Sequence, residues 1–185
     1  MLHSFLISYP ELQTEKLSLR QIKREDAPEL WLLRSHDLIM RYLDREKMSG
    51  VAEAEALIDK IGDSGKEGTG YSWALSLKND EKMIGYSGIW RIDKVNHRGE
   101  IGYTLHPDYW NQGLMTEALR VIVNFGFDQL GLHSLEANVN PGNGASIRLL
   151  EKSGFVREAY FRENYFFRGN FLDSAIYSLI STDRR

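Results

Sequence analysis

The sequence has no cysteine among its 185 residues, and this absence excludes several kinds of chemistry. Disulfides, thiolate nucleophiles and cysteine-based zinc sites are ruled out, although the absence says little about the compartment in which the protein works. The five histidines are scattered, and none follows the spacing of a metal-binding motif. We therefore expect no metal site.

The chain also lacks long apolar runs and an excess of positive charge. No segment approaches the ~20 apolar residues that span a membrane, and no basic segment followed by an apolar one opens the chain. The net charge of −3 argues against a broad basic surface for nucleic acid. We expect a soluble cytoplasmic protein that binds neither membranes nor nucleic acid directly.

The two common nucleotide-binding loops are absent as well. The sequence contains no G-x-x-x-x-G-K-[ST], and no G-x-G-x-x-G follows a predicted strand. Internal repeats and low-complexity linkers are also missing, so nothing marks a domain boundary. The length suits one domain, and we assign residues 1–185 to it.

One stretch that is present, residues 100–118, organises the chain because it predicts a strand, a polar loop and the start of a helix. Residues 100–105 alternate with the period of a strand, and apolar residues recur at helical spacing from Met115 onward. A helix that begins directly after a loop, here the loop around Gly113, directs unpaired N–H groups and the positive end of its dipole at one point. The stretch indicates an anion site suited to phosphate, although many similar loops bind nothing.

The other elements are predicted from periodicity and turn residues. We expect strands at 17–22, 71–78, 83–92, 134–139, 155–165 and 171–180, and helices that begin near Asp26 and cover 51–61 and 145–153. Asp26 and Ser49 are expected to cap their helices, and Gly62 to end the second one. The strand at 134–139 follows a helical crossover and is therefore expected to pair in parallel with the strand at residue 100, which leaves a crevice at their carboxyl ends.

The order of these elements and two motifs resemble the GNAT acyl-CoA N-acyltransferase superfamily. E-I-G-Y-T-L-H-P-D-Y-W-N-Q-G-L-M-T-E-A at 100–118 resembles the acetyl-CoA-binding motif of its RimJ/RimL-like branch, the ribosomal-protein N-terminal acetyltransferases. N-G-A-S-I-R-L-L-E-K-S-G-F at 143–155 resembles the second motif of that branch, and the whole resemblance spans residues 14–181. It implies an α/β (α+β) GNAT fold with a mixed, largely antiparallel sheet of about seven strands, about four helices and a splayed parallel strand pair at the centre.

The resemblance also implies a binding site for acetyl-CoA. Loop amides are expected to bind the pyrophosphate, and main-chain groups of the central strand to pair with the pantetheine arm. The residues expected to contact coenzyme A are Tyr103, Thr104, Leu105, Asn111, Gln112, Gly113, Leu114, Met115, Thr116, Asn138, Asn143 and Ser146. Helix capping is an alternative explanation for Asn143 and Ser146.

Three of the implied roles are catalytic. Glu100 is the favoured general base for the acceptor ammonium, with Glu136 as the alternative. The Leu105 N–H is expected to face the thioester oxygen, and Ser146 to lie near the sulfur. The place of a tyrosine that protonates the leaving thiolate in a related branch is taken here by Leu150, so that role has to move or be absent.

The sequence departs from the superfamily pattern at two loop positions. Trp110 stands where the superfamily has Gln or Arg, and Met115 where it has Gly or Ala. A bulkier Met115 is expected to tighten or shift the loop. For the aromatic residues at 160–161 and 165–167 we favour core positions, with a wall of the acceptor groove as the alternative.

The function implied is that of an acetyl-CoA-dependent N-acetyltransferase, in which a primary amine attacks the thioester directly. A protein or peptide N-terminus is the favoured acceptor. A small amine such as a polyamine, an amino acid or an antibiotic is the alternative, and a non-catalytic coenzyme A sensor is the third hypothesis. The oligomeric state is left open, with a homodimer among the alternatives.

Overall fold

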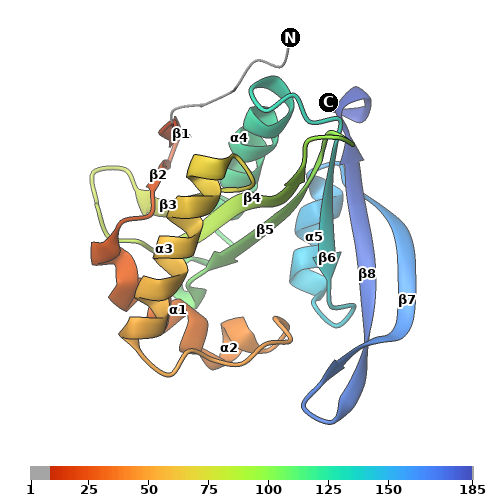
Figure 1. Cartoon of the computed structure of the whole chain (residues 1–185), viewed down its shortest axis with the longest axis horizontal. Helices are drawn as coiled ribbons and strands as arrows, with labels where there is room; N and C mark the ends of the chain where they lie inside the picture. The colour runs from red at the N-terminus through yellow and green to blue at the C-terminus, as the bar shows by residue number, and fades with distance from the viewer. Residues whose placement is uncertain (1–8, 185) are drawn as a thin grey trace.

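The computed structural model describes residues 9–184, which fold around one sheet (Figure 1). Within that range eight strands lie in the order β1-β2-β3-β4-β5-β6-β8-β7. The strands are β1 (Leu12–Gln13), β2 (Leu17–Gln21), β3 (Tyr71–Leu77), β4 (Gly85–Asp93), β5 (Arg98–Leu105), β6 (Ser134–Val139), β7 (Val156–Phe167) and β8 (Asn170–Ile180). The α-helices are α1 (Ala27–Ser35), α2 (Asp37–Met40), α3 (Val51–Glu67), α4 (Leu114–Asp128) and α5 (Gly144–Lys152).

The sheet is mixed, as predicted, and its helices form a layer on each face. Helices α1 and α3 pack on one face around a small apolar core, whereas α4 and α5 cover the other face and contribute to a larger core. The apolar stripe of α4 explains this placement, since Leu119 and Ile122 are completely buried. None of the helices described at 9–184 is both long and apolar enough for a membrane span.

The predicted parallel pair, β5 and β6, is confirmed, and so is its splay. The two strands are paired only at Arg98–Ser134, Gly99–Leu135 and Glu100–Glu136. All other neighbouring strands are antiparallel. Beyond residue 100 the pair separates, and the carboxyl half of β5 lacks a strand partner on that side (Figure 1). This opening places the ends of both strands where a ligand can enter.

Helix α3 is longer than predicted, because it runs through Gly62 and the charged residues after it. At Gly62 neither the backbone angle nor the space for a Cβ requires glycine. Gly68 is the C-cap of the helix, and its φ of +66 lies in the left-handed region that favours glycine. The expected cap at Ser49 was wrong, because Gly50 occupies the N-cap of α3. Asp26 stands at the N-cap position of α1 as predicted, but its carboxylate makes no capping hydrogen bond there and accepts two 2.7 Å hydrogen bonds from Arg20.

None of the aromatic residues of β7 is fully buried and all but the half-buried Phe167 are exposed, so the prediction of core positions for them was wrong. Tyr160, Phe161 and Tyr165 are each about half exposed, and Phe166 is 61% exposed. Strand β7 is at the edge of the sheet and pairs only with β8. An aromatic run shows that a strand has apolar side chains, but the run carries no information on whether a helix covers them.

Candidate active site

The turn between β5 and α4 presents a run of free backbone donors. The N–H groups of residues 111–116 have no backbone carbonyl partner in the described range, and the first helical bond runs from Glu117 N–H to the Gly113 carbonyl at 3.1 Å. Asn111 and Gly113 have φ values of 60° and 76°, which turn the chain into the helix. A Cβ at Gly113 would meet nothing within 4 Å. Glycine is therefore needed there for its backbone angle, and the space beside it is open to a ligand.

A cavity of about 590 Å³ lies beside this turn, and we call it the loop cleft. Its walls come from α2, the end of β5, residues 109–116 and α5, and its size is typical of a small-molecule site. All but one of the residues predicted to contact coenzyme A line it: Tyr103, Thr104, Leu105, Asn111, Gln112, Gly113, Leu114, Met115, Thr116, Asn143 and Ser146. The exception is Asn138, which lines a different cavity.

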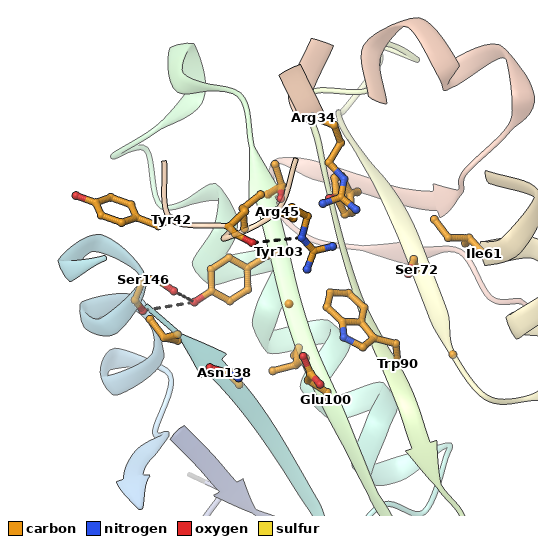
Figure 2. Close-up of a pocket in the computed structure, with 18 of the residues that line it drawn as sticks. Arg34, Tyr42, Arg45, Ile61, Ser72, Trp90, Glu100, Tyr103, Asn138 and Ser146 are labelled. Atoms are coloured by element: carbon orange, nitrogen blue, oxygen red, sulfur yellow. Dashed lines mark hydrogen bonds between the residues drawn. The ribbon is translucent and has the colours of Figure 1, made fainter. Parts of the chain in front are cut away.

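The second cavity, of about 380 Å³, lies between the sheet and helices α1 and α3 (Figure 2). We call it the arginine pocket, because Arg34 and Arg45 line it together with Lys60, Trp90 and Glu100. Six residues border both cavities, and we call this region the junction: Tyr42, Leu43, Tyr103, Thr104, Asn143 and Ser146. The two cavities therefore meet at the opening between β5 and β6.

The covering segment, residues 41–50, joins α2 to α3 and borders both cavities. None of its residues is fully buried. The segment is attached to distant elements by hydrogen bonds: the Tyr165 hydroxyl donates to the Asp44 carbonyl at 3.0 Å, and Arg168 donates to the carboxylate of Glu46 at 3.0 Å. The hairpin of β7 and β8 thus holds the wall of the arginine pocket in place.

A tyrosine–serine pair occupies the junction. The Tyr103 hydroxyl and Ser146 Oγ are 2.7 Å apart, and either can donate the hydrogen bond (Figure 2). Burial raises the pKa of Tyr103 to about 12, so its hydroxyl keeps its proton at neutral pH. Asn143 caps α5 by accepting the Ser146 N–H at 3.1 Å, as the capping alternative supposed. The Ser146 hydroxyl itself is directed at Tyr103, whereas Leu150 is completely buried and lies outside both cavities.

The main chain of Leu105 also faces the junction. His106 N–H donates to the Ile84 carbonyl at 2.9 Å across the β4–β5 ladder. Because hydrogen bonding alternates along an antiparallel strand, the N–H and C=O of Leu105 face the other side, where β6 has separated. The carbonyl accepts the indole N–H of Trp110 at 2.7 Å. This bond fixes the turn to the end of β5 and leaves the Leu105 N–H directed at the opening.

The two carboxylates considered as bases differ in position, although they are neighbours in the parallel register. Glu100 lines the arginine pocket and accepts a hydrogen bond from Arg91 at 2.6 Å, with 18% of its side chain exposed. Glu136 lines neither cavity and lies 3.9 Å from Arg98. Of the two carboxylates, the geometry brings only Glu100 to the cavity that reaches the junction.

Comparison with known proteins identifies the family. Residues 16–156 match the acetyltransferase (GNAT) domain. The chain belongs to the GNAT acetyltransferase family. It is 33% identical over 172 residues to the uncharacterized N-acetyltransferase YoaA of Bacillus subtilis, covering 93% of this chain and 97% of that one. This GNAT chain is thus an N-acetyltransferase, and its co-substrate is acetyl-CoA.

Solved structures share its fold at lower sequence identity. The ribosomal-protein-S5-alanine acetyltransferase of Vibrio fischeri has a TM-score of 0.82 and 23% identity, over 95% of this chain and 99% of that one. The spermidine N-acetyltransferase of Vibrio cholerae, solved with coenzyme A and spermine, has a TM-score of 0.81 and 22% identity, over 92% and 98%. The GNAT fold is confirmed, and the ribosomal-protein enzyme is consistent with the RimJ/RimL-like resemblance.

The loop cleft of this GNAT enzyme fits acetyl-CoA. The free amides of residues 111–116 suit a pyrophosphate, and Arg148 and Lys152 of α5 line the same cleft with positive charge. Met115 is 8% exposed and packs in the large core, so most of its bulk lies below the turn. Both departures from the superfamily pattern, Trp110 and Met115, therefore leave the row of amides open.

Sequence reasoning missed several side chains that the fold brings to the site. The hydroxyl of Tyr103 and the indole of Trp110 were not assigned, although an aromatic residue at an alternating strand position and another in the turn were visible. Nothing in the sequence pointed to Arg34 and Arg45, because they lie far from residue 100 along the chain and reach the pocket only through the packing of α1 and the covering segment.

Proposed function

We propose that this GNAT enzyme transfers an acetyl group from acetyl-CoA to the α-amine of a protein or peptide N-terminus. The observation that carries the proposal is the meeting of the loop cleft and the arginine pocket at the junction. A donor in the cleft and an amine in the pocket reach the same point from opposite sides. Because the chain has no cysteine, direct attack on the thioester accounts for the transfer without a covalent enzyme intermediate.

In this proposal Glu100 is the general base. An α-ammonium group has a pKa near ~8, so a base that takes its proton, directly or through water, increases the share of neutral amine. Glu100 lies in the cavity where the amine binds, and Arg91 holds the carboxylate from outside the pocket. Glu136 stays the alternative base, and a comparison of Glu100→Gln with Glu136→Gln distinguishes the two.

Two further groups act on the thioester side. Acetyl-CoA supplies the acetyl group and the leaving thiolate. The Leu105 N–H, directed at the opening, donates to the developing oxyanion, and such a donor is worth about 3 kcal/mol of barrier. Ser146 donates its hydroxyl proton towards the sulfur, and the hydrogen bond to Tyr103 fixes the Ser146 rotamer. The pair thereby stabilises the leaving thiolate by hydrogen bonding, at the step for which Leu150 offers no proton donor.

The residues that contact coenzyme A form the donor half of the proposal. The amides of residues 111–116 bind the pyrophosphate, the Thr116 hydroxyl adds a donor, and Asn143 and the end of β5 flank the pantetheine arm. Asn138 lies on the acceptor side, so its contact with coenzyme A stays a prediction. A cytoplasmic location and homodimerisation likewise stay predictions.

A small primary amine is the second candidate acceptor. The arginine pocket, at about 380 Å³, can hold a compact amine as readily as the first residues of a peptide. A coenzyme A sensor without turnover does not account for Glu100, Tyr103 and Ser146 around a shared opening. Among relatives, a spermidine N(1)-acetyltransferase of Escherichia coli is 27% identical over 156 residues, which keeps polyamines in the test.

The experiment is an acceptor screen that follows release of coenzyme A thiol from acetyl-CoA. Its arms are peptides with varied first residues, amino acids, polyamines and aminoglycosides. Turnover with peptides carrying a free α-amine, and none with the same peptides acetylated in advance, supports the proposal. Turnover with small amines alone transfers the function to the second candidate.

A further inference from the structure

The arginine pocket contains more positive charge than the proposed chemistry requires. Its charged lining consists of Arg34, Arg45 and Lys60 against a single carboxylate, Glu100. That carboxylate is already bonded to Arg91, whose side chain lies mostly in solvent. No carboxylate of residues 9–184 lies within 4.0 Å of any of the three lining cations, as the ion pairs of that range show.

The two arginines also have few hydrogen-bond partners. Arg34 has a buried Nε with no partner in the described range, and its guanidinium lies 5.8 Å from the centre of the Tyr86 ring. Arg45 donates from Nε to the Leu43 carbonyl at 3.3 Å. The pKa of Arg45 is held below its usual value, first by desolvation and then by the positive charge of Arg34. Two like charges thus share one cavity, and neither has a carboxylate of residues 9–184 within 4.0 Å.

The pocket separates these cations from the proposed base. In Figure 2 the side chains of Arg34 and Arg45 lie above the Trp90 ring, and the carboxylate of Glu100 lies below it. Arg34 comes from α1 and Arg45 from the covering segment, whereas Glu100 comes from β5. The cavity therefore offers an anion site at one end and a base at the other.

We infer, on the basis of the proposed function, that the acceptor is a primary amine that also carries a carboxylate, and that Arg34 and Arg45 bind this carboxylate while the amine reaches Glu100. A guanidinium matches a carboxylate in a bidentate geometry, and the bound anion neutralises the repulsion between the two arginines. A polyamine would instead bring more positive charge into a pocket that already has an excess. Two sources supply the required chemistry: the α-carboxylate of an amino acid, or an acidic side chain close behind a peptide N-terminus.

The first arm of the test compares acceptors with the wild-type enzyme. Hexapeptides that begin Ser-Asp-Glu, Ser-Asn-Gln and Ser-Lys-Lys differ in charge but share the first residue, and free aspartate, serine and spermidine represent small amines. We expect kcat/KM for the acidic peptide, for the free amino acids, or for both to exceed that of the neutral peptide by about 10- to 100-fold, mainly through KM. Equal values for acidic and neutral acceptors, or a preference for spermidine or Ser-Lys-Lys, overturn the inference.

The second arm changes the pocket. Arg45→Gln and Arg34→Gln should each reduce kcat/KM for the preferred anionic acceptor by about 10-fold or more and change the neutral peptide less than about 3-fold. Arg120→Gln is the matched control, because Arg120 is an exposed residue of α4 that lines neither cavity. Arg34 packs on Tyr86, so if Arg34→Gln does not fold, Arg45→Glu decides the question, with a larger loss expected for the anionic acceptor.

The two proposals fail differently. If the wild-type enzyme acetylates no peptide of the panel while acetyl-CoA binds, the proposed function fails, and a preference for the free amino acids alone would still support the inference. If it acetylates peptides or amino acids without regard to charge, or if the arginine variants lose activity equally on all acceptors, only the inference of a carboxylate fails.

Discussion

The loop cleft and the arginine pocket are built in different ways. The free N–H groups of the cleft belong to the main chain of one continuous turn, residues 111–116, whereas the pocket combines side chains from α1, the covering segment, α3 and β5. A site made of backbone amides depends on φ and ψ and tolerates changes of side chain, as Trp110 and Met115 illustrate. A site made of side chains depends on residue identity at positions that are distant in the sequence.

The largest expected effect tests whether the cleft depends on backbone angle. Gly113→Val should abolish acetyl-CoA binding, because a branched side chain is disfavoured at φ 76° and would project among the free amides. Titration calorimetry measures the binding, and circular dichroism verifies the fold. Gly131→Val is the matched control, since Gly131 has φ +64 and a Cβ there also meets nothing within 4 Å. Retained micromolar affinity in Gly113→Val would show that the turn is not the site.

The next effect tests whether the pocket depends on residue identity. Glu100→Gln should retain acetyl-CoA affinity and reduce turnover by about 10²- to 10⁴-fold near neutral pH, the usual contribution of a general base. Raising the pH should restore part of the rate, because more of the amine is then neutral. Glu136→Gln should reduce turnover less than Glu100→Gln does. Steady-state kinetics of both variants from about pH 6 to about pH 10 measure the difference. Normal turnover in Glu100→Gln with a defective Glu136→Gln would assign the base to β6.

A smaller effect is the stabilisation of the folded protein by bound acetyl-CoA. Acetyl-CoA at about 100 times its dissociation constant should stabilise the fold by about 2.7 kcal/mol, because it binds only the folded turn. For a chain of this length that corresponds to a rise in melting temperature of about 5 to 10 °C. Differential scanning fluorimetry measures it, with Gly113→Val as the control that should show no shift. An unchanged wild-type melting temperature at millimolar ligand would contradict the assignment of the loop cleft.

The smallest effect tests the junction between the two regions. The pKa of Tyr103 is raised to about 12 in the folded protein, so between pH 10 and 12 the folded state retains a proton that the unfolded chain has lost. The protonated Tyr103 hydroxyl makes its full contribution to the free energy of unfolding below about pH 10. This contribution decreases as the pH rises towards 12 and is smaller by about 1.4 kcal/mol at pH 11. Tyr103→Phe should therefore lose less stability than wild type between pH 9 and 11 in urea titrations. Parallel curves for the two proteins would mean that the Tyr103 hydroxyl is not buried.

The cleft could be predicted from the sequence because its determinants are local. Strand alternation, Gly113 and the apolar spacing of α4 all lie within 30 residues, and the parallel pairing of β5 with β6 followed from the crossover between them. Helix ends were less predictable: Gly62 resembles a terminator, but only Gly68 adopts a positive φ. The arginine pocket could not be predicted, because its wall depends on tertiary packing. In the sequence, Arg34 is an ordinary cation near the end of a helix. Only the packing of α1 on the sheet shows that Arg34 lines the pocket.

The covering segment has an evolutionary consequence. Its ten residues include none that is fully buried, and it is attached to the sheet through bonds such as Tyr165 to Asp44 and Arg168 to Glu46. Substitutions at its exposed positions therefore cost little core stability, yet they alter the wall of the arginine pocket. Under the proposed function, substitutions in this single short segment would change the preferred acceptor without altering the turn that is proposed to hold the acetyl donor.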